Sequence, residues 1–122
     1  DFNDLCIGTI DHMRTDTKAV LEAGLEVADA TWITARDNGW DWGNADHYIL
    51  HQVSAVHTQL LCKQIGIDPE LAPLTFPQRG NIGPASIPTT LARHQAHIRP
   101  GDTVIIGGIG SGINTLASEI LW

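Results

Sequence analysis

Short apolar runs alternate along this chain with longer stretches of helical periodicity, and no other feature limits its fold as strongly. The runs cover residues 48–50, 71–77, 103–106 and 115–122, and the helical stretches cover 15–36, 53–66 and 84–98. The resulting order is α-β-α-β-α-β-β. Strands that alternate with helices favour βαβ units, so we predict an α/β fold with a mixed, mainly parallel sheet covered by helices.

Local signals mark where several of these segments begin and end. Thr15 or Asp16 can cap the first helix, and Gly66 is a typical C-terminal stop for the second. The last two runs are joined by a glycine loop, so we expect an antiparallel pair, because parallel strands need a long crossover. Residues 1–12 follow neither pattern. We expect an irregular N-terminal segment over 1–12 and one α/β domain over 13–122.

Composition excludes several classes of protein. Apolar residues make up 43% of the chain and charged residues 17%, which is typical of a folded protein rather than a disordered one. No apolar run approaches the 18 or so residues of a membrane span. The formal charge of −7, with seven Lys and Arg, leaves no basic face for nucleic acid. Two cysteines and no signal-peptide pattern favour a cytoplasmic protein.

His51 directly follows the apolar run at 48–50 and therefore stands at the carboxyl end of a predicted strand. Ligands of open α/β sheets bind in the crevice beyond these strand ends. The free N–H groups of the helix that follows add positive partial charge there. Position alone favours a functional histidine and a structural, hydrogen-bonded one equally.

Asn81 holds the matching place after the next predicted strand, in Gly80-Asn81-Ile82-Gly83-Pro84. An asparagine between glycines is by itself more often a turn residue than a functional one. If the two strands are neighbours, however, His51 and Asn81 can aim their donors at one oxygen. That arrangement suits the stabilisation of an enolate or oxyanion.

The glycines at 107–112 do not fit a dinucleotide-binding motif, because their spacing is wrong and a strand follows them. Between two strands they let backbone N–H groups approach a reacting group, although a plain hairpin loop is the simpler alternative. His94 and His97 have the spacing of a metal pair, but no third ligand is near in the sequence. We therefore expect a solvated helix face and no metal site. His57 can reach the crevice of His51, which is the less favoured interpretation.

Three motifs together resemble one family: His51-Gln52-Val53-Ser54, Gly80-Asn81-Ile82-Gly83-Pro84-Ala85-Ser86, and Gly108-Ile109-Gly110-Ser111-Gly112. From about residue 13 to 122 the chain looks like the C-terminal half of a thiolase-fold condensing enzyme of the β-ketoacyl-acyl-carrier-protein synthase III group. The last motif and the terminal Glu119-Ile120-Leu121-Trp122 look most like the OleA type, which joins two acyl-CoA units head to head.

The resemblance implies a role for individual residues. His51 and Asn81 match the active-site His and Asn that stabilise the enolate, and the backbone N–H of Ser111 matches a donor of the oxyanion hole. Gly110 and Gly112 flank that donor and are expected to bind substrate. Ser54 stands where the family often has an asparagine that contacts pantetheine, so a choice between CoA and carrier protein is left open. No residue matches the nucleophilic cysteine.

The implied function is Claisen condensation of an acyl-enzyme thioester with a second acyl-CoA or acyl-ACP, without a cofactor. The implied partners are an N-terminal half that carries the cysteine, the acyl thioesters, and a second copy in a homodimer. The chain alone is expected to be inactive. Two alternatives stay open, namely acyl transfer or thioester hydrolysis at the same site, and a non-catalytic binding or scaffold module.

Overall fold

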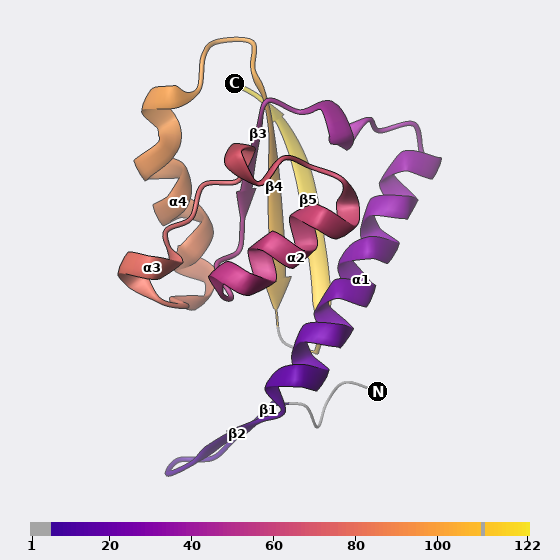
Figure 1. Cartoon of the computed structure of the whole chain (residues 1–122). Coiled ribbons are helices and arrows are strands. Elements are labelled where there is room, and N and C mark those ends of the chain that lie inside the picture. Colours follow the sequence, from indigo (N-terminus) through magenta and orange to yellow (C-terminus); the bar gives the residue numbers. More distant parts are fainter. Residues whose placement is uncertain (1–5, 111) are drawn as a thin grey trace.

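A three-stranded sheet organises residues 6–110 and 112–122, which are the residues described by the computed structural model (Figure 1). The strands are β3 (His47–Leu50), β4 (Thr103–Gly110) and β5 (Asn114–Leu121), in the order β3-β4-β5. β3 runs parallel to β4, and β4 pairs with β5 antiparallel. The mixed sheet and its antiparallel closing pair are confirmed.

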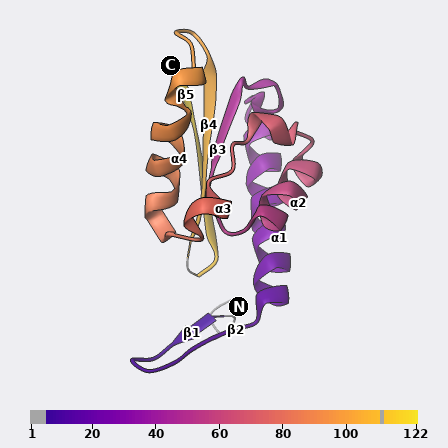
Figure 2. The ribbon, with the colours of Figure 1, turned by 60° about the vertical axis from the view of Figure 1, so that its left-hand side comes forward.

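Helices cover both faces of this sheet. Figure 2 shows α1 (Thr17–Asp37) and α2 (Ala55–Ile65) on one side and α4 (Ser86–His94) on the other. A single turn, α3 (Phe76–Arg79), precedes α4. Short 3₁₀ turns occupy Trp42–Asn44, Pro69–Leu71, Gly83–Ala85 and Gln95–His97.

A small hairpin precedes α1 and extends away from the sheet (Figure 1). It pairs β1 (Cys6–Gly8) with β2 (Met13–Thr15) in antiparallel register. The expected irregular segment over 1–12 is therefore wrong for the strand residues 6–8, where pairing with β2 supplies the order that the local sequence lacks. Residues 1–5 lie outside the described residues.

The central strands divide their side chains between two cores, as the two-residue period of a strand requires. Tyr48, Leu50 and Ile105 belong to the core beneath α1 and α2. Ile49 and Val104 belong to the opposite core, beneath α4. All five are 5% exposed or less, so β3 and the start of β4 are held firmly from both sides.

The helix caps fall where the sequence predicted them. The side chain of Asp16 accepts a hydrogen bond from the Ala19 N–H at 3.0 Å at the start of α1. Gly66 ends α2 in the left-handed conformation, with φ of 77°. These caps fix the ends of the two helices that pack beside the end of β3.

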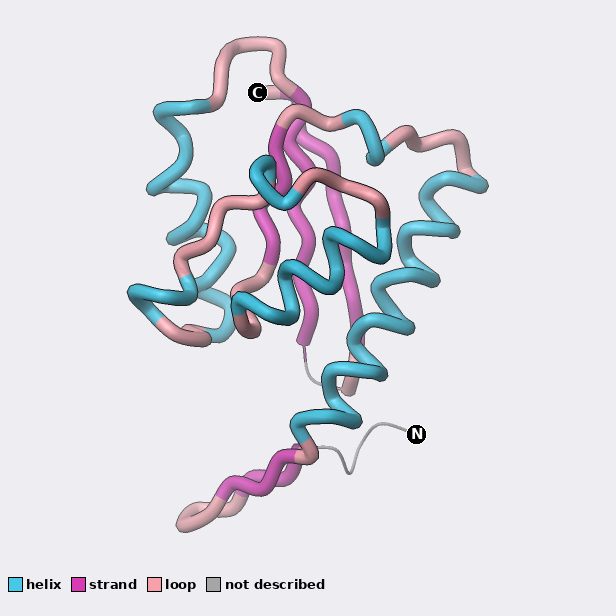
Figure 3. Tube along the Cα trace, viewed as in Figure 1, coloured by secondary structure: helices cyan, strands magenta, loops and turns pink. Residues whose placement is uncertain are grey.

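The predicted strand over residues 71–77 does not form, and this correction changes the connectivity to α1-β3-α2-α3-α4-β4-β5 (Figure 3). Pro73 and Pro77 have no N–H to give to a sheet. The side chain of Gln52 meets the backbone here instead: its Oε1 accepts from the N–H of Thr75 at 2.9 Å and of Phe76 at 3.0 Å. The N–H groups of Thr75 and Phe76 are therefore satisfied without a neighbouring strand.

The expected glycine loop is also shorter than predicted. Gly107 to Gly110 continue β4 and pair with β5, for example Gly107 with Ala117. A side chain at Gly107 would place its Cβ 2.9 Å from Leu50 Cδ2, so the glycine permits close packing between β3 and β4. The predicted strand ended at residue 106 because glycine has no apolar side chain that would continue the strand pattern.

Candidate active site

His51 is the first residue beyond β3, at the carboxyl end of the strand as predicted. Its backbone N–H donates to the Gly107 carbonyl at 2.8 Å, which fixes the residue against β4. The imidazole is half-buried, and this burial lowers its pKa below the ordinary value. The ring is therefore neutral near pH 7 and offers one N–H donor and one acceptor.

An open cleft of about 910 Å³ lies beside His51. Four of the six predicted site residues line it, namely His51, Asn81, Gly110 and Gly112. Its remaining walls are mostly apolar and come from α1, the start of α4 and the β4–β5 end of the sheet. The cleft can therefore admit an apolar ligand while presenting polar groups from two separate loops.

Asn81 reaches this cleft by a route that the sequence did not predict. It follows the single turn α3 rather than a strand, and it lies between two glycines with positive φ, Gly80 at 68° and Gly83 at 58°. Its Oδ1 accepts from the Gly83 N–H at 2.9 Å. That bond occupies the oxygen and leaves the amide NH₂ as the group available to a ligand.

Of the two predicted serines, the structure describes only Ser54, which stands apart from this group. Ser54 caps α2, and its Oγ accepts from the His57 N–H at 3.0 Å. Ser54 lines neither this cleft nor the smaller cavity between α1, α2 and the sheet. Ser111 lies outside the described residues, so the expected oxyanion-hole donor stays a prediction.

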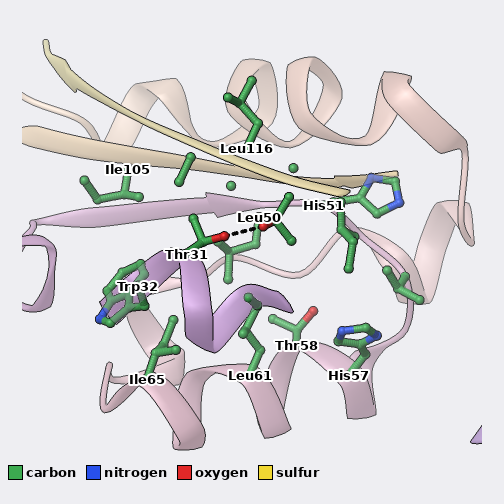
Figure 4. Close-up of a pocket in the computed structure, with 17 residues that line it drawn as sticks. Thr31, Trp32, Leu50, His51, His57, Thr58, Leu61, Ile65, Ile105 and Leu116 are labelled. Atoms are coloured by element: carbon green, nitrogen blue, oxygen red, sulfur yellow. Dashed lines mark hydrogen bonds between the residues drawn. The ribbon is translucent and has the colours of Figure 1, made fainter. Parts of the chain in front are cut away.

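A second, smaller cavity of about 60 Å³ lies between α1, α2 and the sheet (Figure 4). His51 and His57 stand at one end of it, and Trp32 stands at the other. Most of the remaining lining is aliphatic, including Leu61 and Ile65 of α2. The cavity is therefore polar at the end that adjoins the cleft and apolar at its far end.

His57 is a candidate site residue that the motifs did not identify. It lines both cavities and is only 6% exposed. Burial, and secondarily the nearby His51, lower the pKa of its imidazole, so this ring is also neutral near pH 7. Its position one turn into α2, six residues after His51, was the available sequence signal.

Three histidines gather at the opposite end of β3. His47 Nε2 lies 3.1 Å from Asp102 Oδ2, and His47 Nδ1 lies 3.1 Å from His94 Nε2. The ring of His97 stacks obliquely on His94. The expectation of a solvated face is therefore wrong for His94. Within the described part of the chain, no three His, Cys, Asp or Glu side chains are placed to hold a metal ion.

Comparisons with known proteins agree on one group. A family model described as 3-oxoacyl-[acyl-carrier-protein (ACP)] synthase III C terminal matches residues 35–122. The acyl-CoA:acyl-CoA alkyltransferase of Xanthomonas campestris pv. campestris is 38% identical over the whole chain, which covers 37% of that relative.

Solved structures give the same result. The 3-oxoacyl-(acyl carrier protein) synthase III, FabH, of Xanthomonas oryzae pv. oryzae superposes with a TM-score of 0.91 and 40% identity. OleA of Xanthomonas campestris with bound lauric acid and lauroyl-CoA gives 0.91 and 38%. Each match covers 99% of this chain and 37% of the other. The chain thus spans little more than a third of the relatives it matches.

Proposed function

The chain belongs to the 3-oxoacyl-[acyl-carrier-protein] synthase III family, and on that premise we propose that it is the C-terminal half of a condensing acyltransferase. The proposed reaction joins an acyl group, held as a thioester on a cysteine, to carbon 2 of a second acyl-CoA or acyl-ACP. The cysteine belongs to an N-terminal half, in the same or a separate polypeptide. The observation that carries the proposal is that His51 and Asn81 line one cleft.

In the proposed mechanism, His51 and Asn81 stabilise the charge that develops on the second thioester. Carbon 2 becomes nucleophilic when it loses either a proton or, from a 2-carboxylated unit, CO₂. The thioester oxygen then accepts hydrogen bonds from the neutral imidazole N–H of His51 and from the amide NH₂ of Asn81. Carbon 2 then attacks the carbonyl carbon of the acyl-enzyme, a carbon–carbon bond forms, and the cysteine leaves as a thiolate. The backbone N–H of Ser111 stabilises the oxyanion on the acyl group.

The remaining assignments follow from the same proposal. Gly110 and Gly112 line the cleft without side chains, which lets a substrate lie close to the backbone. Ser54 is assigned to the pantetheine arm, in addition to its cap. The chemistry uses thioesters and needs no resident cofactor. The functional unit is proposed to be a cytoplasmic homodimer. No helix in the described residues is long and apolar enough to cross a membrane.

The test grafts these residues in place of the matching C-terminal segment of the Xanthomonas campestris relative. The grafted enzyme is incubated with lauroyl-CoA, because a structure of that relative holds this thioester. We expect CoA release and a new β-keto product by mass spectrometry. His51→Ala and Asn81→Ala should each lower the rate of product formation by about 10²–10³, the usual effect of losing a donor to a developing oxyanion.

A matched control and the alternatives make the result decisive. His97→Ala removes an exposed histidine at the far end of β3 and should leave the rate within about twofold. Release of CoA with free fatty acid as the only product would support hydrolysis instead. A folded graft that shows no reaction, with or without His51, would favour a non-catalytic module.

A further inference from the structure

A continuous chain of side-chain hydrogen bonds joins Asp102, His47 and His94 at the end of β3 that is opposite to His51. Asp102 Oδ2 lies 3.1 Å from His47 Nε2, and His47 Nδ1 lies 3.1 Å from His94 Nε2. The side chains of His47 and Asp102 are only 14% and 22% exposed. These bonds connect the start of β3, the C-terminal end of α4 and the turn before β4. The proposed reaction uses none of them.

Only one arrangement of protons satisfies these bonds when both imidazoles are neutral. Asp102 Oδ2 also accepts from the Arg99 N–H at 2.8 Å, and this bond, with a further contribution from His47, lowers the pKa of the carboxyl below its ordinary value. An ionised carboxylate only accepts hydrogen bonds, so His47 Nε2 carries a proton. A neutral ring has one donor and one acceptor, so His47 Nδ1 accepts and His94 Nε2 donates.

The two imidazoles can share one additional proton but cannot hold two without losing a bond. With one, either ring becomes the cation and donates to the facing nitrogen of the other, which is neutral and accepts. With two, both nitrogens of the 3.1 Å contact carry hydrogen, so the bond is lost and two positive charges face each other. Burial, and then the nearby His47 and His97, lower the pKa of His94, which agrees in direction with this conflict.

Further positive charge lies around the histidine pair. The ring of His97, in the turn after α4, stacks obliquely on His94. Arg93 belongs to the last turn of α4, and Arg99 follows in the turn before β4; both are exposed. A second proton on the pair therefore meets repulsion from these groups, which favours separation of the two rings.

The other acidic groups nearby do not offset that repulsion. Asp46 Oδ2 is engaged by the Thr103 N–H at 2.8 Å. β4 contains no ionisable side chain. In β5, Glu119 shares the sheet face of Ala117, which belongs to the core beneath α1 and α2, because alternate residues of a strand point to the same side. Within the described residues, Asp102 is thus the carboxylate that bonds to the pair.

We propose that Asp102, His47 and His94 form a pH-sensitive latch, which holds the C-terminal end of α4 against the sheet with one shared proton or none and releases it when a second proton binds. Ile87, in the first turn of α4, lines the cleft. The latch therefore holds the far end of an element that forms part of the cleft wall. This inference concerns the fold and does not rest on the proposed function.

Hydrogen–deuterium exchange of the chain, followed by mass spectrometry between pH 7.5 and pH 5, tests the latch. The rates are expressed as protection factors, which remove the pH dependence of exchange in an unfolded chain. We expect the protection of residues 91–98 to fall about tenfold towards pH 5, the effect of losing one hydrogen bond. α1 contains no histidine and reports global unfolding. An equal fall in α1 would overturn the proposal, because the release would then not be local.

Two variants remove the second proton while keeping a polar side chain. In His94→Gln and in His47→Gln the new amide can donate and accept but does not become charged, so protection of residues 91–98 should change by no more than about twofold between pH 7.5 and pH 5. If one variant fails to fold, the other gives the same test. His12→Gln is the control in the exposed turn between β1 and β2 and should show the full wild-type fall. A wild-type chain without the fall, or a folded latch variant that retains it, would overturn the proposal.

Discussion

Gln52 is the residue on which the geometry of the candidate site depends most directly. It is 1% exposed and uses both ends of its amide. Its Oε1 accepts from Thr75 and Phe76, and its Nε2 donates to the carbonyls of Leu50 and Pro73. These bonds tie the end of β3 to the segment that leads towards the second site loop. Gln52 therefore sets the spacing of the two loops that meet at the cleft.

Gln52→Leu should lower the free energy of unfolding by about 2–4 kcal/mol, because it leaves buried N–H and carbonyl groups unpaired. Urea denaturation measures the change. Gln59→Leu is the matched control on the exposed side of α2 and should shift the value by no more than about 0.5 kcal/mol. Equal effects of the two substitutions would contradict the role assigned to Gln52.

Cys62 is a packing residue rather than a nucleophile. It is fully buried in the core under α1 and α2, and burial raises the pKa of its thiol to about 11. In a Cys6→Ser variant, iodoacetamide at pH 8 should modify Cys62 roughly a hundredfold more slowly than an unfolded cysteine, because only the thiolate reacts. Mass spectrometry follows the reaction. Rapid labelling without urea would show that the thiol is accessible and ionised.

At the scale of elements, apolar runs, helical periodicity and caps predicted most of the fold, and tertiary contacts decided the rest. β3 and the start of β4 were predictable because their residues are apolar on both faces. The segment at 71–77 was not, since its backbone bonds go to the side chain of Gln52, which no local pattern reveals. The glycines of β4 hid its second half. The sequence left His57 as a less favoured site candidate, because its packing against Gly24 of α1 is a tertiary contact that no local pattern reveals.

The C-terminal stop of α2 makes a separate prediction. Gly66 has φ of 77°, which an alanine adopts only with strain, so Gly66→Ala should cost about 1 kcal/mol of stability. Gly43 is the control: its φ is not positive, and an added Cβ would meet only the Asp41 carboxylate at 3.8 Å. Thermal unfolding should show a lower midpoint for Gly66→Ala alone. A similar loss in Gly43→Ala would mean that φ is not the cause.

The whole molecule should lose stability as the solution becomes mildly acidic. Burial lowers the pKa of His51, His57 and His94 in the folded state. The unfolded chain, with histidine pKa near 6.5, then binds more protons, so protonation favours unfolding. Stability is complete above about pH 6.5 and falls as the pH drops through the folded pKa values.

Urea midpoints measured between pH 8 and pH 5.5 test this dependence. The midpoint should fall towards pH 5.5, and His57→Leu should make the fall shallower. This window stays above the ordinary pKa range of the carboxylates, so the histidines dominate the change. A midpoint that does not vary, or one that rises with acidity, would contradict the folded-state pKa directions.

At the same scale, the chain carries one side of a site. His51 and Asn81 face an open cleft, and the nucleophile assigned to the proposed reaction belongs to a further part of the fold. This division separates two steps. In the proposed reaction, acylation of the cysteine depends on the N-terminal half, whereas formation of the carbon–carbon bond depends on the donors of this chain.

Intact-protein mass spectrometry of the grafted enzyme during one turnover tests that division most directly. His51→Ala and Asn81→Ala should still acquire the mass of the lauroyl group from lauroyl-CoA, and the acyl-enzyme should then persist without yielding β-keto product. The unsubstituted graft should lose the acyl group as product forms. If the acyl-enzyme of either variant decayed to condensed product as fast as that of the unsubstituted graft, the result would contradict the account.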